Sequence, residues 1–260
     1  MTDVINPNLE SSNRLHLDWV VDVLFRPRVT MPKITAANRN VWLTPLLILT
    51  LVAVLTALVA GPIKKQAAEM GGLQLPDNFQ YFSPEQQAQF QQAAQATQGP
   101  VFIYVFPALL GVARVWLGWL IVGGLLHLVL TLLGGRGNTG TSMNLVAWAS
   151  IPLALREVVR IIAMLGMKQL ITNPGLAGFA PPVSSHLSVY AGNMLAQIDL
   201  YLFWHIALLV LGVKAANGLS LGKVWGGVLF TIFVVLSGQA LFGLVGTLFN
   251  NLSIIRPFFF

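Results

Sequence analysis

Four charged side chains interrupt stretches of the sequence that are otherwise almost entirely apolar. Arg156, Glu157 and Arg160 lie within one such stretch, and Asp199 lies near the start of the next. Ionisable side chains inside apolar helices are energetically costly, so they face protein or water and pair with one another. Because the four charges sum to zero, we expect these residues to form a neutral cluster that joins two helices.

The expected depths of Arg160 and Asp199 favour direct pairing between them. At 1.5 Å per helical residue, Arg160 lies roughly 25 Å from the inner end of its helix, and Asp199 lies roughly 6 Å below the outer edge of the next. Glu157 can also pair with Arg160 along one helix, at the i,i+3 spacing. Three roles stay open for the cluster: fixing the register of the helices, handling a substrate or proton, and contacting a partner.

Other residues with catalytic or ligand-binding chemistry do not form a recognisable motif. His127 and His205 are isolated on apolar faces, and no His-Glu-x-x-His sequence occurs, so a metal site is not expected. The glycine-rich stretch Gly134–Gly140 lacks the Gly-Lys-Ser/Thr that ends a phosphate-binding loop. No nucleophile stands beside a base. We therefore predict that the protein is not an enzyme and binds no cofactor.

The composition indicates an all-α integral membrane protein. Hydrophobic residues make up 55% of the 260 residues and charged residues only 9%, with a mean hydropathy of +0.72. A soluble domain carries about 25% charged residues. The net charge of +6 fits lysines and arginines that set membrane orientation and contact anionic headgroups, so we predict no nucleic-acid partner.

The apolar stretches predict five transmembrane helices. About 20 apolar residues are enough to cross the hydrocarbon core. Gly61-Pro62 is expected to end the first span, and Arg114 is expected to lie at the boundary of the second. The spans are predicted at residues 41–60, 115–133, 143–165, 195–213 and 222–248.

The distribution of basic residues predicts a cytoplasmic N-terminus and an extracytoplasmic C-terminus. With that orientation, the inner segments carry eight lysines and arginines and the outer segments carry four. Residues 41–248 then form the membrane domain, with extracytoplasmic excursions at 62–100 and 166–194 and a tail at 249–260. Ser83-Pro-Glu-Gln86 has the pattern of a capping box and predicts a solvated helix; a disordered linker is the alternative.

The cytoplasmic N-terminal segment, residues 1–40, is predicted to carry a short amphipathic helix in the headgroup zone. Its anchors would be Trp19 and the basic residues Arg26, Arg28 and Lys33. Pro27 and Pro32 are expected to break any longer helix. A soluble docking helix is the competing interpretation.

Small residues open the last span and are candidates for helix packing. Gly222 and Gly226 form a small-xxx-small pattern, and Gly227 follows it. Such glycines allow two helix backbones to approach closely. A contact within the chain is favoured over dimerisation, because the pattern is frequent in membrane helices.

Several motifs together resemble the Yip1-domain family of membrane proteins, in its compact prokaryotic branch. The most specific is Ile198-Asp-Leu-Tyr-Leu-Phe-Trp204, which leads through Leu211-Gly-Val to Leu219-Ser-Leu-Gly-Lys223. The others are Trp19…Leu24-Phe-Arg-Pro27, Leu132-Leu-Gly-Gly-Arg-Gly137, and Ser150-Ile-Pro152 with Pro174-Gly-Leu176. The resemblance implies five membrane helices with a cytoplasmic N-terminus and no catalytic residues. Eukaryotic relatives act in vesicle trafficking with Rab-type GTPases, and some bacterial relatives accompany efflux-type ABC transporters.

The leading functional hypothesis is a non-enzymatic accessory or scaffold protein of the cell inner membrane. It would lie in the lipid bilayer and pack against another integral membrane protein, such as an ABC-type exporter. The alternative is a transporter or lipid-handling permease that uses the buried charges together with His205. The two differ in one structural feature: a water-accessible cavity that reaches the cluster favours transport, and a dry, fully paired cluster favours a scaffold.

Overall fold

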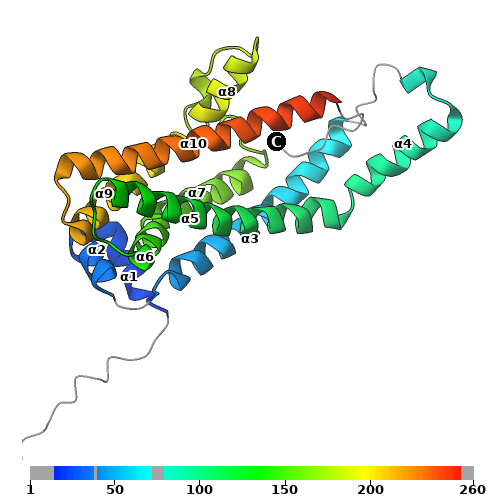
Figure 1. Ribbon diagram of the computed structural model, residues 1–260. Coiled ribbons are helices and arrows are strands. Elements are labelled where there is room, and N and C mark those ends of the chain that lie inside the picture. The colour runs from blue at the N-terminus through cyan, green and yellow to red at the C-terminus, as the bar shows by residue number, and fades with distance from the viewer. Residues whose placement is uncertain (1–14, 38–39, 72–78, 253–260) are drawn as a thin grey trace, which may run out of the picture.

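The computed structural model describes residues 15–37, 40–71 and 79–252, and in these residues all regular secondary structure is helical (Figure 1). Short helical turns occur at Phe79–Tyr81, Val101–Val105 and Ala177–Phe179. The helices are α1 (Asp18–Phe25), α2 (Pro27–Ala36), α3 (Leu43–Gly71), α4 (Pro84–Thr97), α5 (Phe106–Leu132), α6 (Thr139–Ala149), α7 (Ile151–Met167), α8 (His186–Leu195), α9 (Leu200–Asn217) and α10 (Leu221–Leu252).

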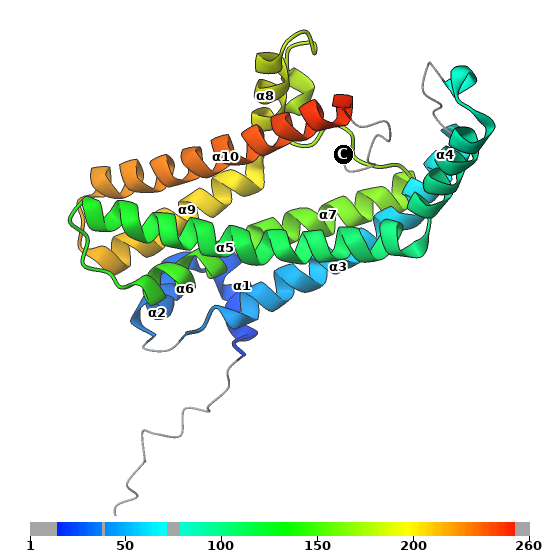
Figure 2. The same ribbon diagram turned by 45° about the vertical axis from the view of Figure 1, so that its right-hand side comes forward.

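The long helices run alongside one another and form an elongated body. Figures 1 and 2 show α1, α2 and α6 at one end of this body and α4 at the other, while α8 projects beside α10. In both views α5 and α10 lie close together near the turn that follows α5, and they diverge toward the end that carries α4.

Four helical segments of the described chain are long and apolar enough to cross a membrane: Leu43–Ala67, Val101–Leu132, Leu200–Asn217 and Leu221–Gly246. The membrane character predicted from composition is therefore confirmed. The predicted third span is not a single helix, so the count of five crossings and the orientation of the termini stay predictions.

The break in the predicted third span, 143–165, occurs at Ser150, between α6 and α7. Pro152 has no backbone N–H and cannot continue the hydrogen-bond ladder of α6. The chain tightens here, because the Leu153 N–H donates to the Ser150 carbonyl at 2.9 Å and the Ser150 hydroxyl donates to the Val146 carbonyl at 2.7 Å. A proline in an apolar stretch thus produced two helices where one was expected.

The second span begins earlier than predicted, because a π-helical turn at Val101–Val105 continues directly into α5. Pro107, which has no backbone N–H to donate, lies where this π-helical turn passes into α5. The helix therefore does not begin at Arg114, and where the membrane boundary falls along it stays a prediction. Arg114 lies inside the helix, roughly 20 Å from Val101 at 1.5 Å per residue.

The first helix also continues past its predicted end. Pro62 lies inside α3, which extends to Gly71, so Gly61-Pro62 does not end the helix, and the end of the membrane span stays a prediction. A Cβ atom at Gly61 would collide with the ring of Tyr104. Close packing of the neighbouring segment against α3 therefore supports the helix at the level where the proline interrupts its hydrogen bonds.

The N-terminal segment is part of the hydrophobic core. Val23, Met31 and Ile34 are fully buried, and the rings of Trp19 and the buried Trp148 lie 5.6 Å apart. The prediction that Pro32 breaks the helix is wrong, because Pro32 lies within α2. The predicted basic anchors Arg26, Arg28 and Lys33 are exposed, and their contact with headgroups stays a prediction.

Polar contacts close the end of the body that carries the two tight turns. Gly134 has φ of +90°, a conformation that favours glycine, and it follows α5 directly. The Gly137 N–H donates to Oδ1 of Asn217 at 3.0 Å, which joins the α5–α6 turn to the end of α9. Lys223 Nζ donates to the Leu133 carbonyl at 2.9 Å and caps α5. Lys223, which the sequence analysis counted only as a signal for membrane orientation, thus also hydrogen-bonds to the C-terminal end of α5.

The polar excursion after α3 contains the predicted capping box. The Gln86 N–H donates to the Ser83 hydroxyl at 3.3 Å, and the Ser83 N–H donates to Oε1 of Gln86 at 2.9 Å. Pro84 then opens α4. The local motif was sufficient to predict this helix, because both hydrogen bonds join residues three positions apart.

Candidate functional site

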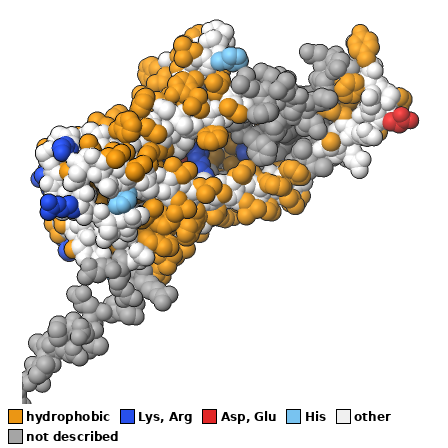
Figure 3. Space-filling model, in the orientation of Figure 1, with side chains coloured by type: hydrophobic (Ala, Val, Ile, Leu, Met, Phe, Trp, Pro, Cys, Tyr) orange, Lys and Arg blue, Asp and Glu red, His pale blue; other side chains and the backbone are white. Residues whose placement is uncertain are grey.

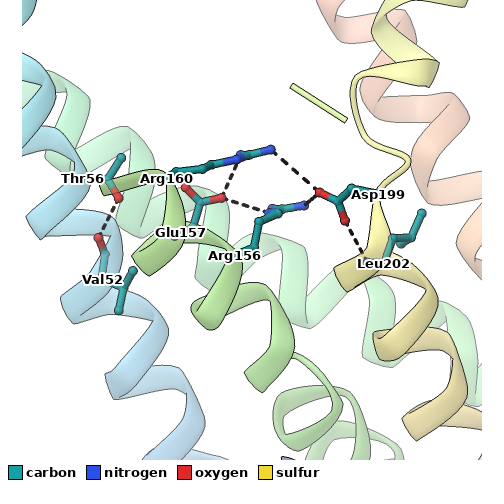
Figure 4. Close-up of polar contacts among 7 residues, drawn as sticks. All are labelled: Val52, Thr56, Arg156, Glu157, Arg160, Asp199 and Leu202. Atoms are coloured by element: carbon teal, nitrogen blue, oxygen red, sulfur yellow. Dashed lines mark hydrogen bonds and ion pairs between the residues drawn. The ribbon is translucent and has the colours of Figure 1, made fainter. Parts of the chain in front are cut away.

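The four charged residues singled out in the sequence lie together in the structure. Arg156 Nε is 3.1 Å and Arg160 Nη1 is 2.9 Å from Oε1 of Glu157. Arg156 Nη1 is 3.4 Å and Arg160 Nη2 is 3.9 Å from Oδ2 of Asp199. Figure 4 shows the two arginines bridging the two carboxylates, between α7 and the start of α9. The pairing expected for Arg160 and Asp199 is the longest of the four contacts, and Arg156 is the closer partner.

Asp199 has a second role, because it is the N-cap of α9. Its Oδ1 accepts a hydrogen bond from the Leu202 N–H at 2.9 Å, while its Oδ2 faces the arginines (Figure 4). The predicted fourth span, 195–213, is therefore corrected: α8 ends at Leu195, and α9 begins only after Asp199. A carboxylate at a helix N-terminus is stabilised by the helix dipole, so Asp199 fixes the start of α9 as well as its link to α7.

The cluster is only partly withdrawn from its surroundings. Between 14% and 25% of each side chain is exposed. Each guanidinium has five N–H donors, and the described protein groups accept two from Arg156 and one from Arg160. Several donors therefore have no acceptor among the described residues.

A cavity of about 420 Å³ lies beside the cluster and is lined by residues of α3, α5, α6, α7, α9 and α10. Arg156, Glu157 and Arg160 lie on its wall. Figure 3 shows basic side chains at the bottom of a hollow whose rim is largely hydrophobic. The Thr56 hydroxyl on the α3 wall donates within its own helix, to the Val52 carbonyl at 2.9 Å (Figure 4). The cavity thus combines apolar walls with a strongly polar patch.

Further cationic residues line the same cavity and were not assigned to it from the sequence. Arg114 on α5 and Lys64 on α3 both lie on its wall. Arg114 is close enough to Arg156, Glu157 and Arg160 to interact with them electrostatically. Four cations thus accompany two carboxylates, so the surroundings of the cavity are cationic although the four residues predicted to cluster sum to zero. The signal in the sequence was an arginine within an apolar stretch, which the sequence analysis used only to mark the boundary of a span.

A comparison with family models identifies the chain. The sequence model of the Yip1 domain matches residues 21–244, which include every charged residue of the cavity. The chain belongs to the Yip1 domain family. This family is one of non-catalytic membrane proteins. Neither the curated proteins nor the solved structures give a match to this chain.

His205 lies on the cavity wall of this Yip1 domain, at the break between α6 and α7. It is buried, and its Nδ1 lies 2.8 Å from the Ala149 carbonyl, which the break removes from the regular helical ladder. The ring thus satisfies a backbone group 56 residues away in the sequence. Among the described residues, no group of three potential metal ligands comes together.

The packing glycines of the Yip1 domain divide into two kinds. A Cβ atom at Gly227 would touch Leu133 and Leu130 of α5, so Gly227 makes the expected contact within the chain. Nothing lies within 4 Å of a Cβ atom at Gly222 or Gly226. The face of α10 that carries Gly222 and Gly226 is therefore not covered by another described segment of the chain.

Proposed function

We propose that this Yip1 domain is a non-enzymatic lipid-handling protein that admits an amphiphilic molecule from the bilayer into its charged cavity. The observation that carries the proposal is that the cavity reaches Arg156, Glu157 and Arg160. A cavity at the cluster was the feature expected of a permease rather than of a scaffold. The proposal places the protein in the cell inner membrane.

The shape and lining of the cavity match an amphiphile. A volume of about 420 Å³ falls within the 300–1,000 Å³ range that is typical of ligand pockets. Apolar residues such as Leu49 and Val235 would contact a hydrocarbon chain, while the arginines would contact a polar group. Residues of both α5 and α10 line the cavity, so the proposal has the ligand enter from the bilayer between these two helices.

The lining gives no reason to add a chemical step. His205, the buried histidine of the wall, engages the Ala149 carbonyl. Its ring nitrogen Nδ1 is thereby occupied and does not face a hydroxyl or thiol nucleophile. The charged residues instead supply hydrogen-bond donors, which bind and orient a ligand.

Two glycines on α5 allow a matched test of occupancy. Gly118 lies on the cavity wall and Gly124 does not, and a Cβ atom at either position meets nothing within 4 Å. Phenylalanine at position 118 would fill the cavity. Native mass spectrometry of protein purified from membranes in mild detergent should show a retained lipid in the wild type and in Gly124→Phe, and its loss in Gly118→Phe. Equal retention by both variants, or no retained lipid in the wild type, would refute the proposal.

A second candidate function is the accessory role, in which the domain packs against another integral membrane protein such as an ABC-type exporter. The observation that favours it is the open face of α10 above Gly222 and Gly226. Leucine at both positions should then abolish co-purification of a defined membrane protein without lowering thermal stability. Repeated recovery of the wild-type chain alone from native membranes would count against this role.

A further inference from the structure

We propose that the cavity is an anion-binding site and that its ligand is an amphiphile with a phosphate- or carboxylate-bearing headgroup, held by Arg114, Arg156 and Arg160. This inference rests on the proposed lipid-handling function and adds the chemical class of the ligand. It is carried by the charges on the cavity wall and by their incomplete pairing.

Arg114 is the residue that distinguishes an anion site from a self-contained salt-bridge cluster. It makes no ion pair or hydrogen bond with any residue that the structure describes. It lies in the interior of the segment Val101–Leu132, on the wall of the cavity. Glu157 is near enough to interact with it electrostatically, but so are the cations Arg156 and Arg160. An arginine inside an apolar segment without a direct ion pair is costly, so an anion that enters the cavity would relieve this cost.

The arginines of α7 add donors to the same space. Both of their carboxylate partners are shared, because Arg156 and Arg160 contact the same oxygen of Glu157 and the same oxygen of Asp199. The remaining guanidinium N–H groups have no acceptor among the described residues. Guanidinium forks bind phosphate and carboxylate with two parallel hydrogen bonds. The chemistry of the site thus selects an oxyanion.

The walls around the arginines select an amphiphile over a small hydrophilic anion. Leu49 and Val52 on α3, Val115 on α5, and Val235 and Leu236 on α10 line the same space. Burial of hydrocarbon against such residues contributes about 0.8 kcal/mol per CH₂ group. A lipid that places its headgroup at the arginines and its chain between α5 and α10 uses both parts of the site.

Two synthetic lipids with identical chains test the headgroup preference. Dioleoylphosphatidylglycerol and dioleoylphosphatidylcholine would be titrated separately onto delipidated protein in detergent, with bound lipid counted by native mass spectrometry. We expect the wild type to bind the anionic lipid at least about tenfold more tightly, as befits a charge-assisted hydrogen bond. Arg114→Gln should remove this preference. Arg136→Gln, which removes an exposed arginine outside the cavity, should leave it unchanged.

A second pair of variants tests the site while Arg114 is kept. Gly118 lies one helical turn after Arg114 on the cavity wall, so a glutamate there would supply an internal counter-ion. Gly118→Glu should lower binding of the anionic lipid about tenfold relative to Gly118→Gln, which has the same size without the charge. Equal binding by these two variants would overturn the inference even if Arg114→Gln fails to fold.

The outcomes separate this inference from the function on which it rests. If Gly118→Phe expels the retained lipid but both headgroups bind equally, lipid handling stands and the anion site is overturned. If no lipid is retained by the wild type, lipid handling itself fails. Inorganic phosphate in excess serves as the third probe. Displacement of the anionic lipid by phosphate alone would support the anion site and identify a free anion as its ligand, and no displacement supports the lipid.

Discussion

Arg156 on α7 lies 3.4 Å from Asp199, the N-cap of α9, although 43 residues separate them in the sequence. The segment between them contains the helical turn Ala177–Phe179 and α8, so this contact joins α7 and α9 across the whole of that excursion. The same pair forms part of the cavity boundary, through Arg156. A structural link and a candidate ligand site therefore share one side chain.

The first prediction concerns this pair. Arg156→Gln and Asp199→Asn should each lower the unfolding temperature in detergent, with a cost of about 1–2 kcal/mol, because each leaves a partly buried charge with fewer partners. The double variant should be less destabilised than the sum of the two, since neither charge is then left alone. Additive effects in this double-mutant cycle would show that the pair is not coupled.

Asp199 requires its own control because it has two roles. Asparagine also caps helices well, so Asp199→Asn removes the charge and keeps the hydrogen bond to the Leu202 N–H. Asp199→Ala removes both and should cost about 1 kcal/mol more. Equal stabilities of these two variants would mean that the cap contributes nothing. Reversal of Arg160 and Asp199 together should restore accumulation only in part, because arginine does not cap α9.

The second prediction concerns the contact between the two tight turns. The amide of Asn217 lies directly against Gly137, so a methyl group in Gly137→Ala would collide with it. We expect this variant to be clearly destabilised, since the buried Asn217 has little room to move. Gly222→Ala is the matched control, because a Cβ atom there meets nothing within 4 Å. Thermal unfolding of the two variants in the same detergent makes the comparison.

The third prediction separates a core role from a peripheral role for the N-terminal segment. Met31 is fully buried, and a Cβ atom at Gly212 of α9 would lie 2.9 Å from its terminal methyl. Met31→Ala should therefore cost about 2–5 kcal/mol, as for other large-to-small core substitutions. Arg28→Ala removes an exposed side chain and should be close to neutral. If Met31→Ala unfolds at the wild-type temperature, α2 does not stabilise the body.

The fourth prediction is that α6 and α7 cross the membrane together as a broken pair. The chain contains no cysteine, so single-cysteine variants need no background substitutions. Thr139 lies at the start of α6 and Gly178 lies beyond α7, and both are exposed. In intact cells a membrane-impermeant maleimide should label Gly178→Cys and should label Thr139→Cys only after permeabilisation. Labelling of both from the same side would exclude the crossing, and with it the five-span arrangement.

Local features of this chain were readable from the sequence because their physics is local. The capping box at Ser83 and Gln86 depends on residues three positions apart. The charged residues Arg156, Glu157, Arg160 and Asp199 were predictable as a group because charges inside apolar helices need partners. The membrane character followed from composition alone.

The ends of the helices were not readable in this way, because distant residues decide whether a helix passes a proline. α3 continues through Pro62, where Tyr104 packs closely against it. The apolar run that contains Pro152 instead breaks at Ser150, and His205 hydrogen-bonds to the Ala149 carbonyl there. Propensity alone assigns both prolines the same effect, so packing made the difference.

The sequence by itself determined that this protein is a bundle of apolar helices with charged residues inside it, since hydrophobicity and the cost of buried charge act on each segment separately. Only the tertiary structure decided that Arg114 joins those charges on the wall of one cavity and leaves it cationic. That outcome depends on where α5 begins and how it lies against α3, α7 and α10. Contacts between helices fix both, and no local pattern encodes them.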